Sequence, residues 1–165
     1  MFSNPRNSRK RIRLARAVYR EGYAFLITIG TADRHPWFGL HPKLTERATK
    51  ILIELARARE TSLYAWSFMS DHVHLLIQDD DVVEFVRLFK GTVVPEARSI
   101  ESVRGLWQRS FHDHALRKDE DLRETAVYVW SNAVEAQLAE EAWHYPWAGS
   151  LVWPDWRELL RDGLF

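Results

Sequence analysis

The fold is decided by the segment LYAWSFMSDHVHLLIQ, residues 63–78. Aromatic, aliphatic and β-branched residues fill positions 63–68 and 72–78, and such short runs are typical of buried strands. Ser70 and Asp71 lie between the two runs and are residues that favour turns. We therefore predict two consecutive strands joined by a tight turn, the second of which ends at Asp79-Asp80-Asp81.

Upstream of this strand pair, the sequence predicts one strand and one helix. Residues 23–29 are aromatic and β-branched, and Gly22 and Gly30 bracket them. From Leu44 to about Arg59, apolar residues recur at the spacing of an amphipathic helix, and Thr45 is a suitable N-cap.

Downstream, residues 82–90 have a helical pattern that Gly91 and Pro95 bound, and the polar residues 95–105 have no clear assignment. Residues 110–117 suit a short fourth strand, and Asp119 or Asp121 caps a helix that runs to about Ala139. This order predicts an α+β fold: a ferredoxin-like βαββαβ antiparallel sheet with helices packed on one face, plus a C-terminal helix.

Composition describes a globular chain of ordinary size. At 165 residues, one domain is expected, and the absence of cysteine excludes disulfides, thiolate metal sites and cysteine nucleophiles. No apolar run has the length of a membrane span and the N-terminus has no signal-peptide core, so we expect a cytoplasmic protein with no membrane partner. We predict a basic N-terminal arm (1–20), one main domain (21–150) and a tryptophan-containing tail (151–165).

The charge is zero overall but very unevenly distributed. Residues 1–70 hold 13 basic and 5 acidic side chains, a net of +8, whereas residues 71–165 hold 10 and 18, a net of −8. The first twenty residues contain seven Lys or Arg and no acid, and could contact phosphates or form a solvated face. The members of this arm that we select as DNA-contacting candidates are Arg9, Lys10, Arg11, Arg13 and Arg16.

The strand that begins at residue 72 carries a candidate metal site. Side chains alternate along a strand, so His72 and His74 project from one face about 6.5 Å apart, while Val73 and Leu75 face the other side. Two imidazoles placed in this way can converge on one divalent ion. The alternative is a pair of polar residues on the wet face of a half-buried strand.

Tyr128 is the candidate nucleophile. On the helix predicted after Asp121, it lies outside the centre of the apolar stripe, and Asn132 follows one turn later on the same face. A tyrosine directed away from the core can act beside a metal ligand, although an exposed tyrosine with no special role gives the same pattern. His112 and His114 form a second His-x-His pair, for which surface or hydrogen-bonding roles are favoured over a metal site.

These pieces together resemble the REP-associated tyrosine transposases, which are single-tyrosine members of the HUH superfamily. Residues 66–76, WSFMSDHVHLL, are similar to their W-x-x-M-P-N-H-V-H-L-L. The other matching pieces are 9–14, 23–31 and 37–39 near the start, 107–117 (W-Q-x-x-F-x-x-H-x-x-R), 128–134 (Y-I-x-x-N-P-V) and 145–150 (Y-P-W-S-S).

The resemblance implies single-stranded or hairpin DNA as substrate, cut and rejoined through a 5′-phosphotyrosine. It implies that Tyr128 is the nucleophile and that His72, His74 and Asn132 hold Mg²⁺ or Mn²⁺. It makes residues 21–150 an HUH transposase-like catalytic domain and adds His114 to the DNA-contacting candidates. It allows active sites within a monomer or shared across a homodimer.

Two departures from the motifs leave the predicted chemistry in place. Ser70-Asp71 replaces Pro-Asn, which adds a negative charge beside the expected phosphate site, and Ala133 replaces a proline, which should let the helix continue. Two other functions remain open: a non-catalytic hairpin-DNA-binding protein on the same fold, and a metal-dependent hydrolase that uses the two histidines and a water.

Overall fold

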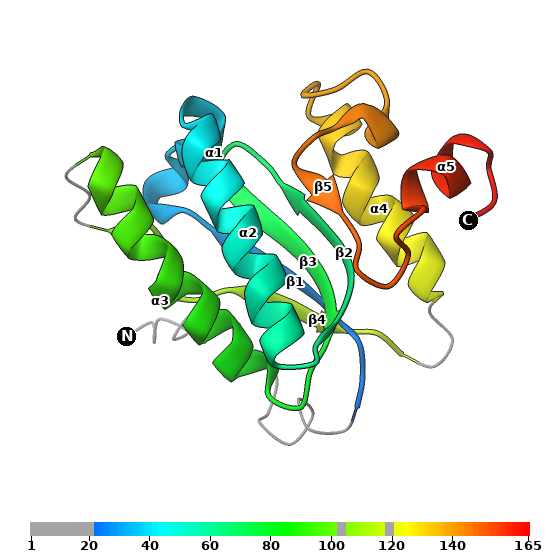
Figure 1. Ribbon diagram of the computed structural model, residues 1–165, viewed down its shortest axis with the longest axis horizontal. Coiled ribbons are helices and arrows are strands. Elements are labelled where there is room, and N and C mark those ends of the chain that lie inside the picture. Colours follow the sequence, from blue (N-terminus) through cyan, green and yellow to red (C-terminus); the bar gives the residue numbers. More distant parts are fainter. Residues whose placement is uncertain (1–21, 102–104, 118–120) are drawn as a thin grey trace, which may run out of the picture.

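Five strands of the chain form one antiparallel sheet in the order β4-β1-β3-β2-β5 (Figure 1). The computed structural model describes residues 22–101, 105–117 and 121–165. The strands are β1 (Phe25–Gly30), β2 (Ser62–Phe68), β3 (His72–Gln78), β4 (His112–Ala115) and β5 (Ala148–Gly149). The helices are α1 (Trp37–Leu40), α2 (Pro42–Ala58), α3 (Val82–Ile100), α4 (Leu122–Glu135) and α5 (Trp156–Arg161), and Ala32–Arg34 and Ala142–His144 form single 3-10 turns. The predicted ferredoxin-like α+β fold is confirmed.

The sheet has an apolar core on each face. Along β3, Val73, Leu75 and Ile77 face α2 and α3, together with the buried residues of β1. Leu76 faces α4 and α5 in a second cluster, in which Trp130 and Trp156 stack with their ring centroids 4.5 Å apart. Helix α4 therefore covers the face opposite to α2 and α3. The residues of β3 between Val73, Leu75 and Ile77 point toward α4.

Helix α3 is longer than the sequence predicts. It continues through Gly91 and Pro95 to Ile100, although both residues usually end a helix. Its buried positions Phe85, Phe89, Val93 and Ala97 recur every four residues across the interruption, so one face stays on the sheet and on α2. Burial of this continuous stripe outweighs the local cost of the proline and the glycine.

Two predicted helix boundaries also differ from the structure. Helix α2 begins at Pro42, and Thr45 is a buried residue of its first turns whose hydroxyl donates to the carbonyl of Phe38 at 2.9 Å; it is not the N-cap. Helix α4 begins after Asp121, whose carboxylate accepts from the backbone N–H groups of Arg123 and Glu124. It ends at Glu135 and not near Ala139, because Gln137 adopts a left-handed backbone with φ of 58°.

The C-terminal residues pack onto the sheet layer. Trp156 is buried, and the Arg157 guanidinium donates to the carbonyls of Trp143, Tyr145 and Ala148, which braces the segment that leads into β5. Among the described helices, none has the length and apolar character needed to cross a bilayer.

Candidate active site

The two histidines of β3 converge as their alternation predicts. His72 and His74 lie on the α4 side of the sheet, with their imidazole rings edge to face and their Nε2 atoms 3.0 Å apart. Two ligand atoms about 2.1 Å from one ion and at right angles to each other lie about 3.0 Å apart. The spacing of the pair therefore fits two adjacent positions around a single divalent cation.

A hydrogen bond to the other nitrogen fixes the orientation of each ring. His72 Nδ1 lies 2.6 Å from Asp71 Oδ1, and since an ionised carboxylate only accepts, Nδ1 is the donor in this bond, which leaves Nε2 as the nitrogen that faces His74. His74 Nδ1 lies 3.0 Å from the hydroxyl of Thr28, the residue paired with it on β1. Because a hydroxyl can donate or accept, His74 can present at Nε2 either a proton toward His72 or a lone pair toward a cation.

The protonation states of these groups suit metal ligation. Burial, with the charge of His72 as a smaller cause, lowers the pKa of His74 to about 4, so its imidazole is neutral at neutral pH. Burial of Asp71 opposes ionisation, but hydrogen bonds from His72 and Arg34 outweigh it and lower the pKa of this carboxyl. A neutral imidazole and an ionised orienting carboxylate are the forms that a metal site requires.

The turn between β2 and β3 is tied to the rest of the chain at several points. Asp71 Oδ2 accepts from Arg34 Nε at 2.6 Å, and the Asp71 carbonyl accepts from both the backbone N–H and the hydroxyl of Thr31. The Ser70 carbonyl accepts from the N–H groups of Phe38 and Gly39. These bonds hold Asp71, and through it the ring of His72, in a defined place.

Helix α4 places Tyr128 beside this pair. The rings of Tyr128 and His74 have centroids 6.3 Å apart, and Tyr128 is 47% exposed, as expected for a tyrosine outside the apolar stripe. Asn132 is one turn further along, and its Nδ2 donates to the carbonyl of Tyr128 at 2.7 Å. That bond leaves the amide oxygen, the atom of the side chain that binds hard cations, for another partner.

The residues around His72 and His74 limit which side chain can serve as a third metal ligand. Among the described residues, no group of three or more His, Cys, Asp and Glu side chains is placed to hold a metal ion. A site built on His72 and His74 must therefore draw a further ligand from another residue type, from water or from substrate. The amide of Asn132 suits this role, and its ligation remains a prediction.

The other predicted site residues are not part of the cluster formed by His72, His74 and Tyr128. His112 and His114 are exposed on the edge strand β4, and their pairing with Thr28 and Leu26 puts them on the same sheet face as His74. Their part in DNA binding stays a prediction. Arg9, Lys10, Arg11, Arg13 and Arg16 lie outside the described residues.

A comparison with known families decides where this chain belongs. The sequence profile described as "Transposase IS200 like" matches residues 19–132, which include the two histidines, Tyr128 and Asn132. The chain belongs to the IS200-like transposase family. As an IS200-like transposase, it carries its candidate site wholly within the matched segment.

Two known proteins resemble this chain, one in sequence and one in fold. A Haemophilus influenzae protein assigned as a REP-associated tyrosine transposase is 29% identical over 94 residues, which are 48% of this chain and 53% of that protein. The match thus spans about half the length of this relative. A solved structure of a REP-associated tyrosine transposase bound to a REP hairpin superposes with a TM-score of 0.63 at 20% identity, over 87% of this chain and 82% of that one. The resemblance that the motifs indicate is confirmed.

Sequence reasoning missed the residues that support this IS200-like site. Asp71 was expected only to add charge near a phosphate, whereas it holds the imidazole of His72 and pairs with Arg34. Arg34 and Thr28 are 37 and 46 residues away from their partners Asp71 and His74, so no local pattern connects them. The one available signal was an acidic residue directly before the first histidine.

Proposed function

We propose that this protein cleaves and rejoins single-stranded DNA with Tyr128 as the nucleophile and a divalent cation held beside it. The observation that carries the proposal is the convergence of the His72 and His74 Nε2 atoms, 3.0 Å apart, next to the exposed ring of Tyr128. A DNA phosphate that reaches this corner of the sheet would contact the ligand pair and the phenol together.

The ligands of the cation would be His72 Nε2, His74 Nε2 and the amide oxygen of Asn132. When bound, Mg²⁺ or Mn²⁺ would supply charge stabilisation to the scissile phosphate and orient it for in-line attack. A mixed imidazole and amide set does not by itself select one metal, so both ions are candidates. Asp71 and Thr28 would keep the two imidazole rings pointed at the site.

The chemistry of the chain itself is a transesterification. The Tyr128 oxygen forms a bond to phosphorus while the bond from phosphorus to the 3′ oxygen breaks, and the phenol proton ends on the 3′ hydroxyl that leaves. The product is a 5′-phosphotyrosine, which conserves the phosphodiester bond energy. Attack by a 3′ hydroxyl reverses the step and rejoins the strand, so no nucleotide cofactor is needed.

The substrate we infer is a DNA hairpin with a single-stranded flank. The solved protein with the same fold is bound to a REP hairpin, and this chain belongs to the IS200-like transposase family. The basic arm, with Arg9, Lys10, Arg11, Arg13 and Arg16, supplies the positive charge that such a partner requires, and His114 is a further candidate contact.

The test is the formation of a covalent adduct. Short palindromic repeats beside the gene, synthesised as single strands, are incubated with the protein and Mn²⁺ and resolved under denaturing conditions. We expect a protein–DNA adduct that Tyr128→Phe abolishes and that Tyr64→Phe, a tyrosine bonded to Gln78 at 3.0 Å, retains.

The other outcomes overturn the proposal. DNA binding without cleavage in any divalent metal would indicate a non-catalytic hairpin-binding protein. Cleavage that survives Tyr128→Phe but not His74→Ala would indicate a hydrolase that uses water.

A further inference from the structure

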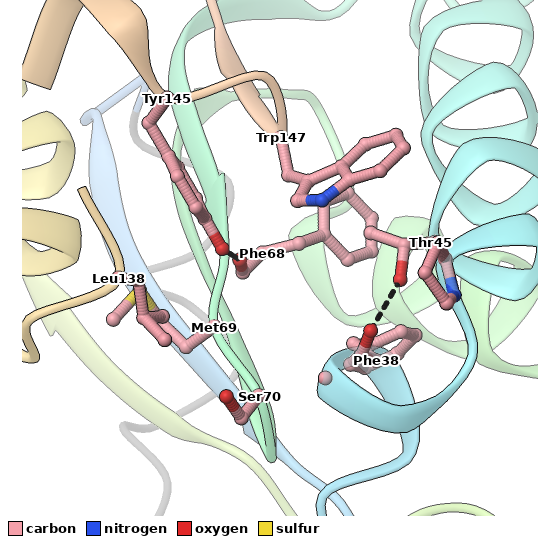
Figure 2. A pocket seen from close by; sticks show the side chains of 10 residues that line it. Phe38, Thr45, Phe68, Met69, Ser70, Leu138, Tyr145 and Trp147 are labelled. Carbon is pink, nitrogen blue, oxygen red and sulfur yellow. Dashed lines mark hydrogen bonds between the residues drawn. The ribbon is translucent and has the colours of Figure 1, made fainter.

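A pocket of about 200 Å³ opens beside the candidate active site, between α1, the start of α2, the end of β2 and the segment that follows α4 (Figure 2). Tyr145 and Leu138 line one side of it, Trp147 lies across it, and Phe38 and Phe68 form much of the remaining wall, with Ser70 at its lower edge in the view. None of these side chains takes part in the chemistry proposed above.

The lining determines the kind of molecule that the pocket can take. Four of its side chains are aromatic and none of its lining residues is charged, so an anionic group would find no counter-charge. Within the described part of the chain, the Ser70 hydroxyl and the Trp147 indole N–H have no hydrogen-bond partner, so two polar groups remain for an occupant. The pocket suits a flat, neutral, hydrogen-bonding ring.

The volume of the pocket further limits which molecules it can hold. Pockets for drug-sized ligands have volumes of roughly 300–1,000 Å³, and this pocket lies below that range. It can accept one ring system, while a sugar and a phosphate attached to that ring would remain outside.

The pocket and the histidine pair share one piece of backbone. Ser70 forms part of the pocket wall, and His72 begins β3 two residues later. The close approach of α1 to this turn depends on Gly39, because a Cβ at that position would lie 2.9 Å from the Ser70 hydroxyl oxygen. The pocket wall and the first of the two histidines are thus only two residues apart along the chain.

Hydrogen bonds within the protein hold the pocket walls in place before any ligand binds. The Tyr145 hydroxyl donates to the Phe68 carbonyl at 2.6 Å, and the Phe68 N–H donates to the Trp147 carbonyl at 2.9 Å. Arg157 of α5 in turn holds the Tyr145 carbonyl at 3.0 Å. Since these bonds do not involve the occupant, little conformational entropy is lost in ordering the site when it binds.

From these features we propose that the pocket holds one unstacked base of the single-stranded DNA next to the phosphate that is cut, and so selects the nucleotide at that position. The inference rests on the proposed function. A base supplies the flat neutral ring and the hydrogen-bonding edge that the lining requires, and its charged backbone would run toward the histidines.

The test uses a pool of random-sequence single strands that are long enough to fold into a hairpin and leave a tail. Strands that the full-length protein retains are sequenced, and the best of them is remade with an abasic site at each tail position in turn. Leu138→Trp narrows the mouth from an exposed rim position, and Val152→Trp is the control, because Val152 is equally exposed and does not line the pocket.

We expect one tail position at which an abasic site weakens binding by roughly 5- to 150-fold, the effect of losing one base–aromatic stack. In Leu138→Trp the same abasic site should have little further effect, whereas Val152→Trp should behave as the wild type. An identical abasic profile in Leu138→Trp and wild type overturns the inference, as does a change of oligomeric state in Leu138→Trp, which would assign the pocket to a second copy of the chain. Failure of the wild type to retain or cut any DNA contradicts the proposed function itself.

Discussion

Asp71 is the residue at which this chain departs most informatively from the motif it resembles. The carboxylate accepts hydrogen bonds from His72 Nδ1 and from Arg34 Nε, each 2.6 Å long. A negative charge that would repel DNA phosphate therefore holds the imidazole of His72 in place. The negative charge is largely met by Arg34, whose side chain is itself 66% exposed. We infer that Asp71 is a positioning residue that acts through His72.

Replacing Asp71 tests this role directly. In Asp71→Ala the His72 ring loses its orienting acceptor, and Mn²⁺ affinity should fall about 10- to 100-fold, the usual effect of losing such a partner. Asp71→Asn keeps an oxygen acceptor and should bind Mn²⁺ more tightly than the alanine variant. The measurement is a calorimetric or EPR titration with Mn²⁺ in the absence of DNA.

Asp80→Ala serves as the charge control, because this exposed carboxylate lies just beyond the other end of β3. It should leave Mn²⁺ affinity unchanged. Equal Mn²⁺ affinity in Asp71→Ala and wild type would show that Asp71 does not position the ligand.

Helix α4 carries Tyr128 to the histidines and ends two turns later, at Glu135. Its end is a Schellman-type turn, in which the Leu138 N–H donates to the Ala133 carbonyl at 2.8 Å while Gln137 has φ of 58°. A left-handed backbone is strained for a residue with a Cβ such as Gln137. The turn that it forms reverses the chain after α4, so that residues 138–147 return toward β2.

Gln137→Gly should therefore stabilise the protein. Relief of the left-handed strain, about 1–2 kcal/mol, exceeds the added entropy of the unfolded chain, about 0.4–1 kcal/mol. We expect a net gain of roughly 0.5–1 kcal/mol in the free energy of unfolding, measured by urea denaturation. Ala136→Gly, at a neighbouring residue with φ of −83°, should instead destabilise, and a loss of stability in both variants would refute the explanation.

A helix, strand or site contact can be predicted from the sequence when the residues that determine it are neighbours in the chain. Residues 63–78 and the histidine alternation were predicted correctly because a strand displays its faces in consecutive residues. Gly91 and Pro95 predict the end of a helix because their local preference is strong, but packing against α2 and the sheet continues α3 to Ile100. The Arg34–Asp71 and Thr28–His74 contacts join distant segments, so only the fold reveals them.

The excess positive charge and the candidate active site lie in different parts of the sequence. The arm that holds most of the excess positive charge precedes β1, while the candidate ligands and Tyr128 lie in the half with a net charge of −8. A neutral total thus conceals two regions of opposite sign. The affinity for DNA should depend on the basic region and the chemistry on the site.

Deletion of residues 1–16 tests this separation. The deletion removes six Arg or Lys side chains, so the magnitude of the slope of log affinity against log salt for a hairpin oligonucleotide should decrease by up to about 5. The Mn²⁺ affinity of the protein without DNA should stay the same. An unchanged affinity and salt slope would place the phosphate contacts on other residues.

Mass spectrometry of the digested protein–DNA adduct is the decisive measurement of the covalent bond between Tyr128 and DNA. After cleavage with Mn²⁺ and nuclease trimming, we expect one modified peptide, with the nucleotide attached through a 5′ phosphate to the oxygen of Tyr128 and with the released strand ending in a 3′ hydroxyl. Cleavage without any adduct, or a nucleotide attached to a residue other than Tyr128, would contradict the account.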